Sequence, residues 1–308
     1  MIKTYYLLTK PGIIMGNLIT TASAFVLASR GHIDFRLFLS TVAGLFFVIA
    51  SACVFNNYID RDADRKMART KNRALAKGLV STRNAILFAL FLGMTGISIL
   101  SLYTNFLAAL IASIGFFVYV ALYSFWKYRT TYATLVGSIS GAIPPVVGYC
   151  AASNRFDLGA ALLFMILVLW QMPHFFSIAV YRFDEYAAAS IPVLPALKGM
   201  QTTKIYMLLY IIAFTLAVLL LTVFGYTGYA YLTVAILLGS TWGWLCIKGF
   251  KADNDRVWAR QMFRLSLVVI TGLSIMMSLD GIKDLAKPLL TLQPAKSLEV
   301  GSRDSNGL

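Results

Sequence analysis

Charged residues and cysteine are scarce in this chain. Only 13% of its 308 residues are Asp, Glu, Lys or Arg, and only three are cysteine. Cys53, Cys150 and Cys246 all fall within long apolar runs, where cysteine behaves as a small apolar residue. This placement excludes a disulfide framework and a cysteine-based metal cluster. The low charge content argues against the two soluble domains that a chain of about 300 residues would otherwise suggest.

Apolar residues are abundant instead, at 59% of the chain, and the mean hydropathy is +0.74. A helix needs roughly 20 apolar residues to cross a bilayer. Nine runs meet this requirement, at about 11–29, 37–57, 84–102, 105–124, 133–152, 159–180, 205–224, 228–248 and 263–280. We therefore predict an all-α polytopic membrane protein with nine transmembrane helices. Residues 1–286 are expected to form one membrane-embedded domain, and the polar tail at 287–308 is expected to be disordered.

A net charge of +14 could indicate a protein that binds nucleic acid, but the distribution of the charge along the chain indicates a membrane protein. If the N-terminus is cytoplasmic, 20 of the 27 lysines and arginines fall in the segments on the cytoplasmic side and 7 on the other. Such a bias is the topology signal of membrane proteins. It predicts that the N-terminus lies in the cytoplasm and the C-terminus outside. We expect the surroundings to be the lipid of the bacterial inner membrane, and not nucleic acid.

A polar stretch from Asn56 to Arg73 follows the second apolar run. Asn56, Asp60 and Asp64 recur every four residues, so on a helix they share one face. Carboxylates at a membrane helix end are costly unless they have partners. Oxygen ligands of this kind suit Mg²⁺, which takes one or two carboxylates and leaves positions for phosphate oxygens. The alternative is a solvated helix end.

The same stretch carries Arg61, Arg65, Arg69 and Arg73, again at steps of four. Like charges at that spacing repel one another on a helix, and an anion lying across them would relieve the repulsion. The alternative is that these arginines serve only as topology signals. Together with the carboxylates, they predict a site for a metal-bound diphosphate.

A second polar cluster follows the sixth run and comprises Tyr181, Arg182, Asp184, Glu185 and the more distant Lys198. Four crossings separate it from the first cluster, so both face the same side of the membrane in either orientation. The carboxylates, Asp184 above all, are candidates for a second Mg²⁺ ion, and Arg182 or Lys198 for contact with phosphate oxygens. The alternative is a solvated loop with local ion pairs.

His174 is one of only two histidines, and it lies inside the sixth run beside Pro173. It precedes Tyr181 by seven residues, or about 10 Å along a helix. A polar ring at this depth is expensive unless it has a function or a partner. Three roles remain open: axial ligation of haem iron, general base catalysis, and a hydrogen-bonded core histidine.

The spacing N-x-x-x-D-x-x-x-D at Asn56, Asp60 and Asp64 resembles the first aspartate-rich motif of the membrane-embedded aromatic prenyltransferases. That superfamily includes the 4-hydroxybenzoate polyprenyltransferases and the chlorophyll synthases. The closer resemblance is to its haem-farnesylating branch, and it covers nearly the whole chain. The stretches that carry it are C-V-F-N-N-Y-I-D-R-D, W-Q-M-P-H-F and I-P-V-L-P.

The resemblance implies a bundle of nine helices around a central cavity, with farnesyl diphosphate and haem b as substrates. Mg²⁺ on Asp60 and Asp64, supported by Asn56, would hold the diphosphate. The family arginines match Arg69 and Arg73, and Arg65 is included as a further contact. His174 matches the histidine of the haem-using branch and is expected to contact the porphyrin. The chain departs from the family pattern at two positions, Ala74 and Ala188, where relatives often have proline and aspartate.

The chemistry implied is ionisation of the allylic diphosphate, capture of the farnesyl carbocation by a haem vinyl group and addition of water. Aromatic side chains are expected to shield the cation, with Phe55, Tyr119, Tyr123 and Tyr149 as candidates. Haem A synthase or a terminal oxidase assembly are candidate partners for the product. Two alternatives remain: a prenyltransferase acting on an aromatic quinone precursor, and a membrane transporter of haem or an anionic lipid.

Overall fold

The computed structural model describes residues 2–282, and all the regular elements in that range are helical. The predicted tail at 287–308 lies outside the described residues. The α-helices, in chain order, are α1 (Ile2–Leu8), α2 (Pro11–Ser29), α3 (Phe35–Lys66), α4 (Thr82–Tyr103), α5 (Phe106–Phe117), α6 (Ser124–Trp126), α7 (Ala133–Gly141), α8 (Ile143–Ser153), α9 (Leu158–Tyr181), α10 (Phe183–Ala188), α11 (Leu194–Lys198), α12 (Met200–Val223), α13 (Tyr229–Lys248) and α14 (Asp255–Ile282). A π-helical segment, Val118–Tyr123, joins α5 to α6.

Within residues 2–282, nine segments are long and apolar enough to cross a membrane, which confirms the predicted number of spans. The protein is therefore a multi-pass membrane protein. Two boundaries differ from the prediction by more than five residues. The second span continues to Lys66 and the ninth begins at Asp255, because regular backbone hydrogen bonding extends into polar sequence where hydropathy no longer signals a helix.

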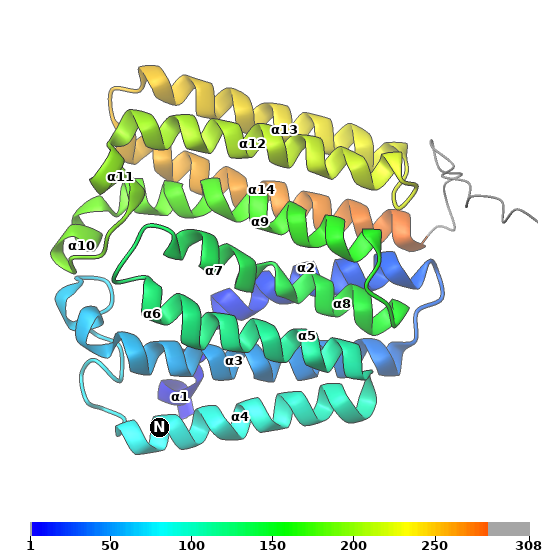
Figure 1. Ribbon diagram of the computed structural model, residues 1–308, viewed down its shortest axis with the longest axis horizontal. Coiled ribbons are helices and arrows are strands. Elements are labelled where there is room, and N and C mark those ends of the chain that lie inside the picture. Colours follow the sequence, from blue (N-terminus) through cyan, green and yellow to red (C-terminus); the bar gives the residue numbers. More distant parts are fainter. Residues whose placement is uncertain (1, 283–308) are drawn as a thin grey trace, which may run out of the picture.

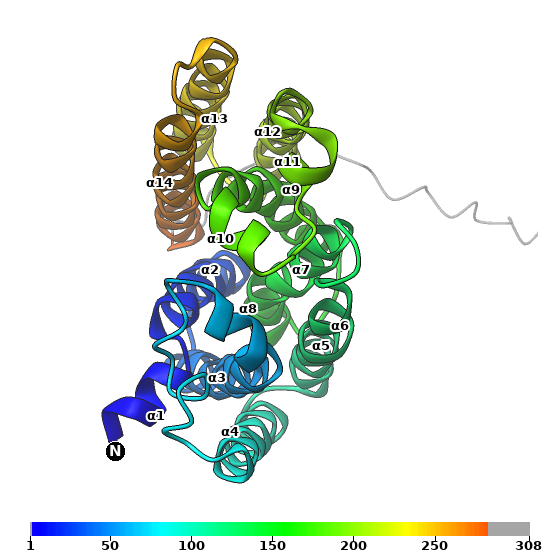
Figure 2. The ribbon, with the colours of Figure 1, turned by 90° about the vertical axis from the view of Figure 1, so that its left-hand side faces the viewer.

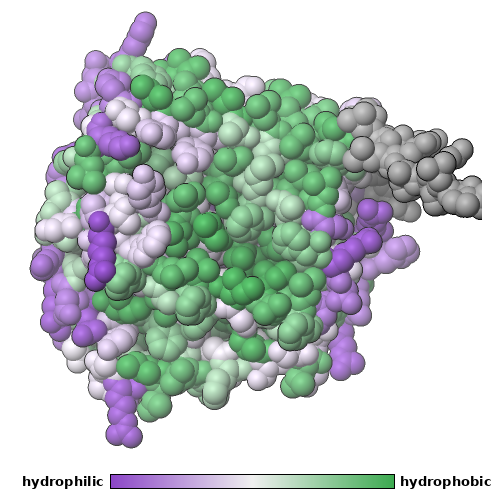
Figure 3. Space-filling view, viewed as in Figure 1, coloured by the Kyte–Doolittle hydropathy of each residue, from purple (hydrophilic) through white to green (hydrophobic). Residues whose placement is uncertain are grey.

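The long helices run side by side along the longest axis of the molecule (Figure 1). Seen from one end, α2 and α8 lie near the middle of the bundle, and the first and last spans meet where α14 packs against α2 (Figure 2). Helix α2 also packs on α8 and α3, and α9 packs on α12 and α14. Figure 3 shows hydrophobic surface across the middle of the visible face, with hydrophilic side chains gathered at its two ends. The central cavity that the family resemblance implies stays a prediction.

Small residues allow the helices to approach closely, as packing in lipid requires. A Cβ atom on Gly148 of α8 would lie 2.2 Å from the carbonyl oxygen of Thr21 on α2. The Pro144–Pro145 pair predicts a bend or a break in the fifth span. The break is confirmed, since α7 ends at Gly141 and α8 begins at Ile143.

The loops after α3, α6 and α9 lie at the same end of the bundle, on the left in Figure 1, which we call the basic end. The loop at 67–81 folds back over the end of α3. Its Leu75 and Val80 are buried in one hydrophobic cluster with Ala50 and Val54 of α3. This packing fixes the backbone that carries Arg69 and Arg73.

Candidate functional site

The polar end of α3 brings Asn56, Asp60 and Asp64 to one face, as their spacing predicted. Asn56 is 3% exposed and Asp64 is 2% exposed. Buried polar groups of this kind require partners. Each of the three contacts a cationic side chain from a different segment of the chain. The face is therefore a meeting point of several segments, which excludes the simple solvated helix end.

Asp64 is paired with Arg73 from the loop at 67–81. Nη1 of Arg73 donates to both carboxylate oxygens, at 3.0 and 2.8 Å. The hydroxyl of Thr70 donates to the carbonyl oxygen of Asp64 at 3.1 Å, which ties the loop to the last turn of α3. Arg73 therefore lies at the predicted site although α3 ends at Lys66 and the regular row of arginines does not continue on a helix.

Asp60 is held by two neighbours from the loop after α6. The ammonium group of Lys127 forms an ion pair with its carboxylate, and the hydroxyl of Tyr128 donates to Oδ1 at 2.7 Å. Burial lowers the pKa of Lys127, although the charge of Asp60 opposes this shift. Burial and then the charge of Asp60 raise the pKa of the Tyr128 hydroxyl, so it remains a proton donor at neutral pH.

Asn56 accepts a hydrogen bond at Oδ1 from the ammonium group of Lys10, the residue that precedes α2. Burial lowers the pKa of Lys10 to about 8. The amide nitrogen Nδ2 of Asn56 is buried and has no protein partner among residues 2–282. It is a free donor beside two carboxylates and their cations, so it can donate to an oxygen of a bound anion.

The second cluster meets the first at the basic end. Glu185 on α10 forms ion pairs with Arg182, at 3.0 Å, and with Arg69 of the loop at 67–81, at 3.6 Å. Burial lowers the pKa of Arg69, and the nearby charges of Arg182 and Arg73 act in the same direction. The contact between the loops confirms that both clusters lie at one end of the bundle, as the even number of crossings predicted.

We call the residues joined by these contacts the polar cluster. Its members are the cations Lys10, Arg69, Arg73, Lys127 and Arg182, the carboxylates Asp60, Asp64 and Glu185, and the neutral side chains Asn56 and Tyr128. Oxygen donors for a hard cation therefore stand beside an excess of positive charge suited to an anion.

Three predicted site residues contact other groups. Asp184 is 68% exposed at its side chain and pairs with Arg256 of α14 at 2.7 Å. Lys198 of α11 lies 6.0 Å from the ring centroid of Tyr206. Arg65 donates to the carbonyl oxygen of Ala76 and to Asp62.

Asp184, Lys198 and Arg65 therefore make no direct contact with Asp60 or Asp64 in the described structure. Residues 2–282 also bring no three His, Cys, Asp or Glu side chains together as a metal centre. The second metal ion at Asp184, and the phosphate contacts of Lys198 and Arg65, stay predictions. Tyr181 receives a hydrogen bond at its hydroxyl from Arg182 at 3.0 Å and so borders the cluster.

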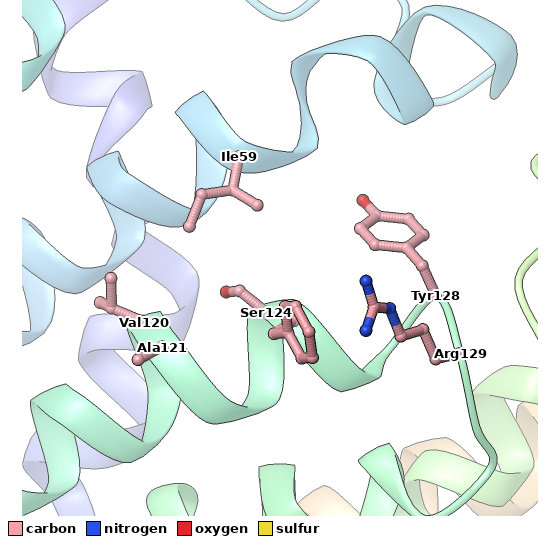
Figure 4. A pocket seen from close by; sticks show the side chains of 7 residues that line it. Ile59, Val120, Ala121, Ser124, Tyr128 and Arg129 are labelled. Carbon is pink, nitrogen blue, oxygen red and sulfur yellow. The ribbon is translucent and has the colours of Figure 1, made fainter.

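An open surface depression of about 490 Å³ lies beside the polar cluster (Figure 4). Its lining comes from α3, the π-helical segment, α6 and the loop that follows, and comprises Ile59, Val120, Ala121, Ser124, Phe125, Tyr128 and Arg129. Tyr128 belongs to both the lining and the cluster. The carboxylate of Asp60 is thus one hydrogen bond away from this largely apolar space.

Of the aromatic side chains expected to shield a cation, Tyr119 and Tyr123 are stacked with ring centroids 5.4 Å apart. Phe55 packs edge-on against Phe116. Tyr149 was wrongly included, because its hydroxyl donates to Asp157 in the loop between α8 and α9, at the opposite end of the bundle. The predicted span at 133–152 already placed Tyr149 near the outer end of that helix, so the sequence itself carried the signal against it.

His174 lies on α9 with its ring stacked on Trp170 at 4.7 Å and with Nδ1 2.7 Å from the hydroxyl of Ser266 on α14. It therefore has the protein partner that a buried histidine requires.

Lys10, Lys127 and Tyr128 were not among the predicted site residues. The parity of the crossings could have identified the last two, since the loop after the fourth span must face the same side as the loops after the second and sixth. Lys10 precedes Pro11 at the start of the first span, and the same parity places it on that side, because two crossings separate it from the loop after the second span.

Comparison with known proteins agrees with this geometry. The model of the UbiA prenyltransferase family matches residues 17–268. Protoheme IX farnesyltransferase of Protochlamydia amoebophila (strain UWE25) is 56% identical over 280 residues, which are 91% of this chain and 99% of that protein. The protein of the same name from Photorhabdus laumondii subsp. laumondii is 53% identical over 281 residues, 91% of this chain and 96% of that protein.

Solved structures share the fold at low identity. Digeranylgeranylglyceryl phosphate synthase superposes with a TM-score of 0.77 at 18% identity, covering 91% of this chain and 98% of that one. A UbiA homolog from Archaeoglobus fulgidus bound to GPP and Mg²⁺ superposes with a TM-score of 0.64 at 16% identity, covering 89% of this chain and 99% of that one. By the extent of the family match and the identity to its curated relatives, the chain belongs to the UbiA prenyltransferase family.

Proposed function

We propose that this protein transfers the farnesyl group of farnesyl diphosphate to a vinyl group of haem b, with water added, to give haem O. The observation that carries the proposal is the pair Asp60 and Asp64 on one face of α3, surrounded by lysines and arginines from three other segments. The 56% identity of this chain to a protoheme IX farnesyltransferase supports farnesyl diphosphate and haem b as the substrates.

The donor set at α3 fits Mg²⁺. Asp60 and Asp64 supply carboxylate oxygens one helical turn apart, and hard oxygen ligands of this number are typical for Mg²⁺ bound together with phosphates. When bound, Mg²⁺ supplies electrostatic stabilisation of the negative charge on a departing diphosphate. The UbiA homolog from Archaeoglobus fulgidus, which has the same fold, binds GPP and Mg²⁺.

The cations of the polar cluster bind and orient the diphosphate. Lys127 and Arg73 pair with the carboxylates and Lys10 with Asn56, each from a separate segment, so their charges converge on one face of α3. Arg69 and Arg182 add charge from the two loops that Glu185 joins. Donors fixed before the reaction stabilise the charge that develops as the allylic C–O bond breaks.

The farnesyl carbocation must be kept from water until the vinyl group attacks it. The stacked pair Tyr119 and Tyr123 offers aromatic faces next to the cluster, and Phe55 with Phe116 adds apolar surface. Aromatic faces attract cations, and dry surroundings suppress hydrolysis to farnesol. His174, farther along α9, is the proposed contact of the porphyrin.

The proposed function also predicts the orientation of the protein in the membrane and the proteins that receive its product. The excess of lysine and arginine at the basic end predicts that this end faces the cytoplasm of the bacterial inner membrane, with the N-terminus inside and the C-terminus outside. Surrounding lipid would deliver both hydrophobic substrates. Haem A synthase or a terminal oxidase assembly would receive the product.

The test uses purified protein in lipid nanodiscs with farnesyl diphosphate and Mg²⁺, supplied separately with haem b and with 4-hydroxybenzoate. Mass analysis is expected to find a hydroxyethylfarnesyl adduct of haem only. Prenylated 4-hydroxybenzoate would instead support a quinone-precursor enzyme, and movement of haem without any covalent product would support a transporter.

Asp60→Ala and Asp64→Ala are expected to abolish the product while the protein still folds. Asp62→Ala is the matched control, because its exposed carboxylate lies on the same helix and contacts only Arg61 and Arg65. Full activity of either Asp60 or Asp64 variant would remove that residue from the proposed metal site.

A further inference from the structure

The hydroxyl of Ser266 lies within hydrogen-bond distance of both His174 Nδ1 and the carbonyl oxygen of Phe263. Ser266 Oγ donates to the carbonyl oxygen of Phe263 at 2.6 Å, a bond to its own helix. A hydroxyl has one proton and can accept further hydrogen bonds. With that proton directed toward Phe263, Ser266 Oγ accepts a hydrogen bond from His174 Nδ1 across their 2.7 Å contact. The neutral imidazole is then protonated at Nδ1 and carries its lone pair on Nε2.

The ring is also held in place. Trp170, one turn earlier on α9, stacks on it at 24° between planes, and its own Nε1 donates to the carbonyl oxygen of Ser266 at 2.9 Å. Phe263 lies against the ring at a centroid distance of 5.0 Å. The stacking restrains the plane of the imidazole, and the bond to Ser266 restrains its rotation within that plane. The direction of Nε2 is thus fixed by α9 and α14 together.

Nε2 itself remains free in the described part of the chain. It makes no hydrogen bond to residues 2–282, and it is not among their fully occluded polar atoms without partners. The His174 residue is 9% exposed. Because the two nitrogens lie on opposite sides of the imidazole, Nε2 points away from Ser266 and toward solvent-accessible space.

We propose that Ser266 is a positioning residue that holds His174 as the Nδ1–H tautomer, so that Nε2 serves as an axial ligand of the iron of substrate haem. This inference rests on the proposed function, because it assumes haem as substrate. A histidine that ligates a metal characteristically donates its other ring N–H to a protein acceptor, which fixes the tautomer and strengthens the ligand. The Ser266–His174 pair has this arrangement. The aromatic rings of Trp170 and Phe263 add apolar surface suited to a porphyrin.

The experiment is a titration of ferrous haem b into the nanodisc-embedded protein, followed by absorbance and by the iron–histidine stretching band in resonance Raman spectra. The wild type is expected to show the band, and His174→Ala to lose it. In His174→Gly, added imidazole is expected to restore an axial ligand. Ser266→Ala is expected to shift the band and to weaken haem binding by roughly 10- to 100-fold.

Two variants separate positioning from packing. Ser266→Thr keeps the hydroxyl and is expected to restore the wild-type band. Ser274→Ala removes another buried hydroxyl from α14, roughly 12 Å further along, which has no partner among residues 2–282, and is expected to change nothing. A band that persists in His174→Ala, or that is identical in Ser266→Ala and wild type, overturns the inference.

Product analysis on the same preparations keeps this inference apart from the proposed function. Wild-type protein that makes farnesylated haem without an iron–histidine band retains the function and contradicts the ligation. Loss of product in His174→Ala with an unchanged band would assign general base work to His174 and also contradicts the ligation. Wild-type protein that binds haem through His174 but forms no farnesylated product contradicts the function and leaves the ligation supported.

Discussion

Arg73 and Asp64 form an ion pair in which the carboxylate is almost completely buried, so removing the arginine alone leaves an unpaired charge. We expect Arg73→Met to lower the free energy of unfolding by about 3 kcal/mol, the order found when one partner of a buried pair is removed. Adding Asp64→Asn should recover most of that stability while leaving the enzyme inactive. Thermal unfolding and product formation measure the two effects.

Arg65→Met is the matched control, because Arg65 lies on the same stretch but contacts Asp62 and a backbone carbonyl. It should retain stability, and its KM for farnesyl diphosphate tests the predicted phosphate contact of Arg65. If Arg65→Met lost as much stability as Arg73→Met, charge removal in general and not the pair with Asp64 would be responsible.

Lys10 predicts a pH dependence of diphosphate binding. Its pKa is about 8 because burial disfavours the charged form, so the ammonium group loses its proton as the pH rises through about 8. A neutral amine no longer attracts the diphosphate. The KM for farnesyl diphosphate should therefore rise roughly tenfold between about pH 7 and about pH 9.5, the size of one charge-assisted hydrogen bond.

Lys10→Arg is the diagnostic variant for this limb of the pH profile. An arginine keeps its charge throughout this range, so the increase of KM with pH should disappear. An unchanged pH dependence in Lys10→Arg would assign the limb to another group.

At the scale of elements, Glu185 joins α10 to the loop that follows α3. Its carboxylate holds Arg69 and Arg182 at once, and both ion pairs are partly exposed. Partly exposed pairs contribute about 1 kcal/mol or less, so Glu185→Gln should raise the KM for farnesyl diphosphate by about fivefold with little change in stability. Initial rates over a range of diphosphate concentrations check this.

Asp184→Asn is the neighbouring control, because Asp184 pairs with Arg256 and makes no contact with the loop at 67–81 in the described structure. It also tests the second metal ion predicted for Asp184. A change in the Mg²⁺ concentration needed for activity would support that ion, and an unchanged requirement would contradict it.

The end of α3 shows which parts of an element the sequence can predict. The four-residue spacing of Asn56, Asp60 and Asp64 required only helical geometry, and the shared face is confirmed. The cations that meet these side chains come from other segments, and their choice depends on tertiary contacts such as the packing of the loop at 67–81 on α3. Spacing could not assign Lys127 to Asp60 or Lys10 to Asn56, because each lysine lies far from its partner in the chain.

At the scale of the whole molecule, hydropathy and charge predicted more than local patterns did. Nine apolar runs gave nine spans within residues 2–282, because each span must satisfy its backbone hydrogen bonds internally in lipid. The parity of the crossings placed two distant clusters at one end, where Arg69 and Glu185 are in contact. Which helices touch is decided by side-chain packing, so the closure of α14 on α2 was not predictable from hydropathy.

Closure of the bundle depends on tight contact between α2 and α8, and Gly148 tests it. A methyl group at Gly148 would collide with a backbone oxygen of Thr21 at 2.2 Å, which only a shift of one helix can relieve. We expect Gly148→Ala to lower the free energy of unfolding by about 2 kcal/mol, since overpacking of this kind costs more than the helix propensity gained. Gly243→Ala on α13 is the matched control, because the nearest atom to its new Cβ lies 3.9 Å away. It should keep or slightly raise the unfolding temperature, because alanine favours helix over glycine. Equal unfolding temperatures for the two variants in detergent would show that α2 and α8 are not held in close contact at this position.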